Sequence, residues 1–143
     1  MNNFKTFSGK SEITGMRSGY NAIVGANGSG KSNLIDALLF VFGYNSHMMR
    51  QDRNLSLISH ISNANTGYVE IVFHITPKTH PEEKFTYISE KTKRVMRRTI
   101  MPDGSTLFQV DNEVINSKDA KAYLFDLGID LHHNRFLILQ GQV

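Results

Sequence analysis

Val24–Ser32, with the sequence VGANGSGKS, has the spacing of a loop that holds phosphate groups. The pattern G-x-x-x-x-G-K-[ST] is met at its fixed positions by Gly25, Gly30, Lys31 and Ser32. Glycine lets the backbone bend so that successive N–H groups point at phosphate oxygens. Lys31 is expected to reach the β- and γ-phosphates, and the Ser32 hydroxyl to ligate Mg²⁺. The expected nucleotide contacts of the loop are Gly25, Asn27, Gly28, Ser29, Gly30, Lys31 and Ser32.

The segments on either side of the loop have the character that the motif requires. Tyr20–Val24 is a short apolar run, and it predicts a buried strand that ends at the glycine-rich turn. Lys31–Gly43 is apolar nearly all round a helical wheel, which predicts a buried helix with Gly43 at its C-terminal stop. The N-terminus of that helix adds the positive end of its dipole to the site. This context argues against a glycine-rich turn that binds nothing.

The apolar pattern changes to a period of two further along the chain. Val69, Ile71, Phe73 and Ile75 alternate with polar residues, which predicts a strand with one buried face. The other expected elements are a short helix at Leu55–His60, strands at Lys84–Ser89 and Arg94–Ile100, a turn at 101–106, a strand pair or a strand and bend within 107–115, a helix from its N-cap Ser117 to Gly128, and a last strand at Arg135–Gln140. This order predicts an α/β fold with a mixed sheet that contains an antiparallel meander.

Length and composition are those of a single globular domain. The chain has 143 residues, of which 40% are hydrophobic and 20% charged, and its formal net charge is +3. Without cysteine it has no disulfide or thiolate metal site, and its six histidines show no spacing of a zinc site. The N-terminus has no signal-peptide core, and the longest apolar run, Ala37–Phe42, is too short to cross a bilayer. We therefore expect a soluble intracellular protein with no membrane partner.

Several parts of a complete nucleoside triphosphatase are missing from the sequence. It has no Asn-Lys-x-Asp string for guanine. No predicted strand is a continuous apolar run that ends in the Asp or Glu needed beside the Mg²⁺ water shell. A small-molecule kinase would also need an acceptor site and a lid, which usually require a longer chain. The sequence therefore predicts half of a catalytic site.

Three segments in this order are more specific than the loop alone: NFKTFSG at Asn3–Gly9, the run Ala22–Gly43 around the loop, and GIDLHHNRFLILQGQV at Gly128–Val143. Together they resemble the N-terminal lobe of an SMC (structural maintenance of chromosomes) ATPase head. The helix and the closing segment look most like the condensin subunits that form the fourth eukaryotic paralogue group. The resemblance implies an ABC-type P-loop NTPase half-domain, in which residues 1–143 are the N-terminal lobe and end about where a coiled coil would begin.

The sequence departs from the family pattern at a few places. Ala26 stands where proline is common and Gln142 where glutamate is common, and neither change is expected to affect nucleotide binding. Only two residues precede Asn3, where the family usually has an apolar strand, so we expect an exposed sheet edge.

The resemblance also implies cofactors and partners. ATP and Mg²⁺ are the cofactors, and the C-terminal lobe of the same chain brings the Walker B strand. The other implied partners are a second SMC subunit in a heterodimer, a kleisin with the associated condensin subunits, and DNA. The implied location is the nucleus and its chromosomes, with the cytoplasm when the protein is not bound to chromatin.

Three single positions outside the loop match functional residues of the family. Gln140 matches the glutamine that joins the Mg²⁺ shell and senses the γ-phosphate. Arg50 matches an arginine that approaches the nucleotide and DNA, and Lys5 a lysine near the nucleotide and the DNA-facing top of the head. The plainer alternatives are a solvated glutamine, a surface arginine (Arg53 is close enough to confuse the alignment) and a solvated lysine. Lys31, Gln140 and Arg50 form the implied catalytic set, and Ser32 and Gln140 the implied metal ligands.

A basic stretch follows in the predicted meander. Lys91, Lys93, Arg94, Arg97 and Arg98 place five of the sixteen basic residues within eight positions. On a strand, Arg94 and Arg98 share one face with Met96, while the other three share the opposite face. Because basic residues lie on both faces and cannot all be buried, at least one face must be exposed to solvent. The stretch is either a solvated hairpin or a surface that contacts the DNA backbone.

Three functions remain open on this reading. The first is the ATP-binding lobe of a chromosome-condensation ATPase, inactive without its second lobe and a partner head. The second is a DNA-contacting structural module in which nucleotide only sets the shape. The third is a self-sufficient P-loop GTPase or kinase. Turnover by the isolated chain would favour the third, and DNA binding that ignores ATP would favour the second.

Overall fold

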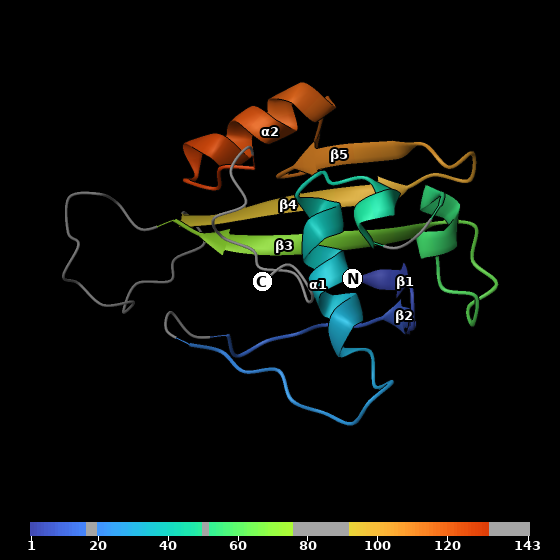
Figure 1. The fold of residues 1–143 in the computed structure, drawn as a ribbon. Helices are drawn as coiled ribbons and strands as arrows, with labels where there is room; N and C mark the ends of the chain where they lie inside the picture. Colours follow the sequence, from blue (N-terminus) through green and yellow to red (C-terminus); the bar gives the residue numbers. More distant parts are fainter. Residues whose placement is uncertain (17–19, 50–51, 76–91, 132–143) are drawn as a thin grey trace.

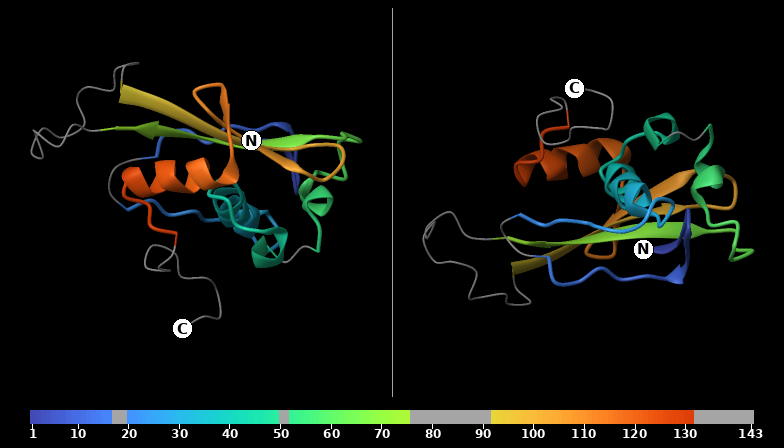
Figure 2. Two further views of the ribbon diagram at one scale, coloured as in Figure 1. Left: turned by 90° about the horizontal axis from the view of Figure 1, so that it is seen from above. Right: turned by 60° about the horizontal axis from the view of Figure 1, so that its bottom comes forward.

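The computed structural model describes residues 1–16, 20–49, 52–75 and 92–131, which contain one six-stranded sheet and two α-helices. The spatial order of the sheet is β2-β1-β3-β4-β5-β6. Both helices lie on the same face of the sheet (Figure 1 and Figure 2). The elements are β1 (Asn2–Phe4), β2 (Phe7–Lys10), α1 (Lys31–Val41), β3 (Gly67–His74), β4 (Lys93–Ile100), β5 (Thr106–Val110), β6 (Glu113–Ile115) and α2 (Ser117–Asp126).

The long strands follow the alternation of their sequence. β3 and β4 pair along their full length, from Gly67 opposite Ile100 to His74 opposite Lys93. Val69 is buried, and Ile71 and Phe73 are partly buried against the core, whereas Val72 on the outer face is 41% exposed. The predicted buried face is thus confirmed at these three residues, but Ile75 lies beyond the strand and is 38% exposed. β4 pairs with β5 and β5 with β6, so the antiparallel meander is confirmed. Every strand pair among the described residues is antiparallel, and the parallel pair of a mixed sheet is not among them.

Helix α1 begins at the phosphate loop and ends where the sequence predicts. Its second half is buried and packs against β3 and β4, through Ala37, Leu39, Phe40 and Val41. Gly43 follows the helix with a φ of +94°, a left-handed conformation that closes a helix and suits glycine. The start of α1 is therefore the end that lies nearer to solvent.

The N-cap of α2 is Asn116, and the prediction of Ser117 was wrong by one residue. The Asn116 side chain accepts a hydrogen bond from the Asp119 N–H at 2.9 Å and donates from Nδ2 to the Asp119 carboxylate at 2.7 Å. Serine and asparagine cap helices equally well. The Asn116 side chain thus bonds both the backbone and the side chain of Asp119, the third residue of the helix, which fixes Asn116 as the cap.

Short turns connect the remaining elements. The helix expected at Leu55–His60 is a single 3₁₀ turn, η2 (Asn54–Leu57), after which Ile58 bridges to Phe4 of β1. A second 3₁₀ turn, η1 (Ser46–Met49), follows α1. β2 forms one edge of the described sheet and β6 the other.

The core lies between the sheet and the helices. Its fully buried side chains include Phe4, Leu39, Phe40, Met96, Ile100 and Leu124. The rings of Phe4 and Phe40 are 5.4 Å apart at an interplanar angle of 42°, a tilted arrangement that aromatic pairs favour. This contact holds the β1–β2 hairpin against α1.

The predicted buried strand at Tyr20–Val24 was wrong. Residues 20–26 belong to no helix or strand, Tyr20 is fully exposed, and Val24 is 87% exposed. An apolar run is buried as a strand only where another strand can pair with it. None of the six described strands takes that place.

Two other predicted strands, Lys84–Ser89 and Arg135–Gln140, lie outside the described residues. Within the described part of the chain, neither helix has the length and apolar character needed to span a membrane.

Candidate nucleotide-binding site

Lys31 is folded onto the loop that precedes it. Its Nζ donates to the carbonyl oxygen of Gly25 at 2.7 Å and to that of Ala26 at 2.6 Å. These bonds tie the first residues of the loop to the first residue of α1. Because an ammonium group has three donors, Nζ keeps one for an anion placed over the loop.

The glycines of the loop are required by its shape. Gly28 and Gly30 have φ values of +79° and +91°, in the left-handed region that side chains disfavour. A Cβ on Gly25 would lie 2.8 Å from the Ser29 hydroxyl oxygen, closer than real contacts allow. The backbone conformation therefore favours glycine at positions 28 and 30, and a side chain at position 25 would require the Ser29 hydroxyl to turn away.

The N-terminus of α1 offers unused donors to an anion. Its N-cap, Gly30, supplies no side-chain hydrogen bond, and the first turn contains no acidic residue. The first N–H groups of a helix lack intrahelical acceptors, and the helix dipole adds positive potential there. The exposed Ser32 side chain lies in the same turn. An ammonium, backbone donors and a hydroxyl together fit a nucleotide phosphate with its metal ion.

The turn between β1 and β2 contacts the start of α1. Lys5 Nζ donates to Asp36 Oδ2 at 2.5 Å and to the Met49 carbonyl oxygen at 3.0 Å. Thr6 Oγ1 accepts a hydrogen bond from Asn33 Nδ2 at 2.8 Å. The sequence analysis missed these contacts, although Asn33 and Asp36 are three residues apart and so share one side of the helix.

Of the three single positions that the resemblance implies, only Lys5 is described by the structure. Its side chain is 11% exposed and forms an ion pair with Asp36. Arg50 and Gln140 lie outside the described residues, so their roles stay predictions.

Two arginines of the basic stretch on β4, Arg94 and Arg97, pair with carboxylates. Arg97 donates to Glu70 Oε2 from Nε at 2.8 Å and from Nη2 at 2.5 Å, and its guanidinium lies 4.5 Å from the Tyr68 ring centre. Arg94 Nε lies 3.5 Å from an Asp111 carboxylate oxygen. Lys93 is half-buried on the same strand, and Lys91 lies outside the described residues.

Arg98 belongs to the core, so its placement in a DNA-facing set was wrong. It is 7% exposed, and its guanidinium carbon lies 4.4 Å from the Phe40 ring centre and 4.8 Å from that of Phe108. Nη1 donates to the carbonyl oxygens of Phe40 and Tyr44, each at 2.8 Å. Burial lowers the pKa of Arg98 to about 10. Arg98 shares its face of β4 with Met96, as predicted, and that is the face which the helices cover.

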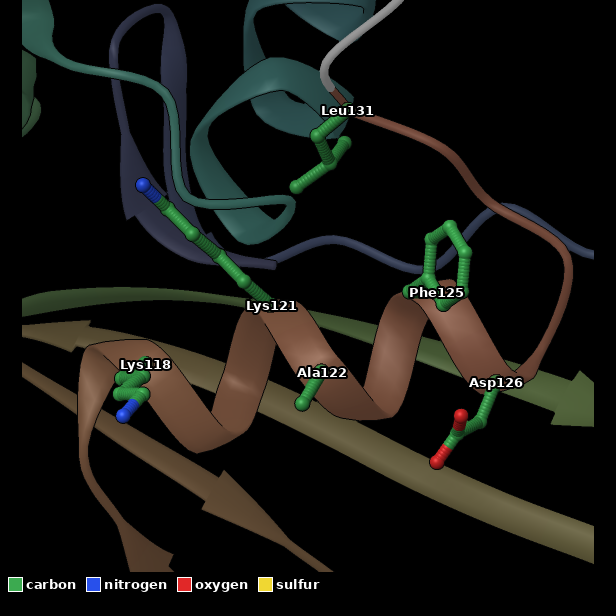
Figure 3. A pocket seen from close by; sticks show the side chains of 6 residues that line it. All are labelled: Lys118, Lys121, Ala122, Phe125, Asp126 and Leu131. Carbon is green, nitrogen blue, oxygen red and sulfur yellow. The ribbon is translucent and has the colours of Figure 1, made fainter.

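A shallow pocket over α2 shares no residue with the phosphate loop. It has a volume of about 290 Å³ and is lined by Lys118, Lys121, Ala122, Phe125, Asp126 and Leu131 (Figure 3). Phe125 is 62% exposed there. Its lining shows no paired acid, base or nucleophile, so the phosphate loop remains the candidate site.

The fold and the loop can be compared with known proteins. The family model described as the RecF/RecN/SMC N terminal domain matches residues 1–132. The chain belongs to this family. The match includes the phosphate loop, the β1–β2 turn and the whole described sheet of this RecF/RecN/SMC chain.

Curated relatives resemble the entire chain. The chromosome condensation protein dpy-27 of Caenorhabditis elegans is 38% identical over 99% of this chain and 10% of its own length. The structural maintenance of chromosomes protein 4 of Dictyostelium discoideum is 36% identical over 100% of this chain and 11% of its own length. The chain thus spans about a tenth of the length of the curated relatives that it matches.

Solved structures share the fold. One, from work on ATP-driven dimerization and DNA-stimulated activation of SMC ATPases, has a TM-score of 0.82 and 30% identity over 98% of this chain and 82% of its own. Another, an Smc head domain from Pyrococcus furiosus with an extended coiled coil, is bound to the C-terminal domain of ScpA. Its TM-score is 0.78, with 30% identity over 98% of this chain and 34% of its own. These matches confirm the predicted resemblance to SMC heads and their P-loop NTPase fold.

Proposed function

We propose that this chain is the ATP-binding N-terminal lobe of an SMC head of the condensin type. The observation that carries the proposal is the phosphate loop, where Lys31 bridges the carbonyls of Gly25 and Ala26 at an uncapped helix N-terminus. Family membership and the names of the relatives, a chromosome condensation protein and an SMC protein 4, support ATP as the nucleotide and chromosomes as the place of action. The proposed location is therefore the nucleus, with a cytoplasmic fraction that is not bound to chromatin.

Different residues of the loop would bind different parts of the nucleotide and its metal ion. Bound ATP with Mg²⁺ would supply the triphosphate and the metal ion on which hydrolysis depends. Lys31 and the N–H groups of residues 25–32 would bind the phosphates, and Ser32 would ligate the metal. Gln140 is the proposed second protein ligand of the metal. Arg50 is the cation proposed to stabilise the negative charge that develops on the transferring phosphoryl group.

The proposed lobe provides half of a catalytic site. Tyr20–Val24 supports this division, because this apolar run leads directly into the phosphate loop with Tyr20 and Val24 in solvent. The proposed neighbour is the C-terminal lobe of the same protein, which would cover the run with a strand and bring the Walker B acid. A partner SMC head would bring the signature motif. The chain alone is then expected to bind ATP weakly and not to hydrolyse it.

Larger partners follow from the same proposal. A second SMC subunit would form a heterodimer with this one, and a kleisin with the associated condensin subunits would bind the pair. The Pyrococcus furiosus head that is bound to a domain of ScpA supports a kleisin partner. DNA contact is proposed through Lys91, Lys93, Arg94 and Arg97, of which Arg94 and Arg97 would first have to leave Asp111 and Glu70.

Titration calorimetry of ATP with Mg²⁺ into the chain, beside the Lys31→Ala variant, tests the proposal. We expect weak binding that the variant loses, and no turnover by either protein. Equal binding by both would show that the loop is not the site. Steady-state hydrolysis clearly above the Lys31→Ala level would overturn the half-site argument and favour a self-sufficient enzyme. DNA binding by the assembled head that ignores ATP would favour the structural module.

A further inference from the structure

The turn between β1 and β2 holds an unfavourable backbone conformation beside the phosphate loop. Lys5 has a φ of +48°, in the left-handed region that non-glycine residues rarely adopt. Such strain persists only where neighbouring contacts hold it, and it concentrates at functional sites. Three contacts hold Lys5: its N–H donates to the Leu57 carbonyl at 2.8 Å, and its Nζ donates to Asp36 and to the Met49 carbonyl.

The same turn contacts the phosphate loop and the helix that follows it. Asn33 comes directly after the loop and donates to Thr6 Oγ1. A Cβ on Gly30, the N-cap of α1, would lie 3.0 Å from the same Thr6 oxygen. Asp36, one turn further along α1, accepts from Lys5. Two neighbouring turn residues therefore bond Asn33 and Asp36, three positions apart at the start of α1, and Thr6 leaves little room for a side chain at Gly30.

We propose that the turn Lys5–Thr6 is a clamp that positions the phosphate loop, and that Lys5 acts through Asp36 and not as a ligand of the nucleotide. The proposal rests on ATP binding at the loop. The Lys5 and Asp36 side chains are 11% and 17% exposed, so moving the ammonium to a phosphate would leave a largely buried carboxylate without its partner. Lys5 is thus a positioning residue that fixes the first two turns of α1.

The Asp36→Asn variant separates this role from direct binding by the sign of its effect. If Lys5 bound the phosphates itself, Asp36→Asn would remove a negative charge near the anion and release the ammonium, so ATP affinity would rise or stay unchanged. If Lys5 acts through Asp36, the variant loosens the clamp and affinity falls. We expect about fivefold weaker binding, the loss that corresponds to one net hydrogen bond of ~1 kcal/mol. Asp126→Asn on α2 is the matched control, because it removes the same charge away from the clamp.

A cycle with Lys5→Met measures whether the two residues act as one unit. We expect Lys5→Met to weaken ATP binding about as much as Asp36→Asn does. The double variant should bind ATP no more weakly than either single variant. Lys5→Arg should retain most of the affinity, and Lys10→Met on the same hairpin is the control for lost positive charge. Thermal melting of each variant shows whether it folds.

Thr6 provides a second and milder pair of variants if the Asp36 or Lys5 variants do not fold. Thr6→Val removes the acceptor for Asn33 and should weaken ATP binding, whereas Thr6→Ser keeps the hydroxyl and should bind like the unaltered chain. The clamp is overturned if the Asp36→Asn variant binds ATP as well as the unaltered chain or better. It is also overturned if Thr6→Val leaves ATP binding unchanged. Failure of the proposed function looks different, because the unaltered chain would then bind ATP no better than Lys31→Ala.

Discussion

Arg98 Nη1 donates a hydrogen bond to the carbonyl oxygen of Phe40 at 2.8 Å, and so joins β4 to the last turn of the helix that begins at the phosphate loop. The same nitrogen donates to the Tyr44 carbonyl just beyond the helix. A cation at this end is favourable because the C-terminal carbonyls carry the negative end of the helix dipole. α1 is thus held at its start by the β1–β2 turn and at its end by Arg98.

Arg98→Met should destabilise the fold by about 2 kcal/mol or more, because the Tyr44 carbonyl loses its buried donor and the charge between two rings is lost. The Phe40 carbonyl keeps the Gly43 N–H as a donor at 3.0 Å, which limits the loss. Urea unfolding measures the change in the free energy of unfolding, with Lys118→Met as the surface control. Equal stability of Arg98→Met and the control would contradict a structural role for the guanidinium.

Neutralising Arg94 and Arg97 should weaken sequence-independent DNA binding by the assembled head, and should reduce the slope of log K against log salt by up to ~0.9 per lost phosphate contact. Glu70→Gln should have the opposite effect, since it frees Arg97 from its carboxylate. Affinity measured over a range of salt concentrations tests both. If neither change moves the slope, the outer face of β4 is only a solvated surface.

Gln140→Ala should leave ATP binding nearly intact but lower hydrolysis ~100-fold when the C-terminal lobe is supplied, because a small misplacement at the reacting groups has an effect of that size. Most ground-state affinity should come from Lys31 and the loop N–H groups, which contact the phosphates directly. Nucleotide affinity and turnover are measured for Gln140→Ala beside Lys31→Ala, which should lose binding. Unchanged hydrolysis would remove Gln140 from the metal site.

The pKa of Asp103, in the turn at 101–106, can be measured directly. Hydrogen bonds from the Ser105 hydroxyl, and then from the Ser105 N–H, hold the pKa of Asp103 below its usual 3.8. The ionised form therefore stabilises the turn above pH 3.8, and this contribution disappears as the pH falls through the folded pKa. In Ser105→Ala the pKa should rise part of the way toward 3.8, as followed by NMR of the carboxyl group. An unmoved pKa would mean that the hydroxyl bond does not form in solution.

Features with a local cause were predictable from sequence. The period of two in β3, the loop glycines and the helix stop at Gly43 depend on backbone geometry that neighbouring residues determine. The pairs that organise the candidate site are distant in the chain. Lys5 and Asp36 are 31 positions apart, and Arg98 and Phe40 are 58 apart. No periodic pattern relates such residues.

Two errors show where sequence patterns lose information. Alternation correctly placed Arg98 on one face with Met96, but it does not tell which face of the strand the helices cover. The apolar run Tyr20–Val24 has the composition of a buried strand, yet burial depends on a neighbour that none of the described strands provides. In both cases the missing information is tertiary.

Tyr20, Ile23 and Val24 expose apolar side chains next to the phosphate loop. A short, uncharged segment with β-forming side chains in solvent favours strand pairing between molecules. We expect the chain to self-associate as its concentration rises, and Ile23→Lys to keep it monomeric, as light scattering would show. Light scattering that stays at the monomer value for the unaltered chain would mean that the segment is shielded in solution. If the chain does self-associate, its shelf life, its yield and its demand for chaperones depend on a handful of side chains next to the phosphate loop.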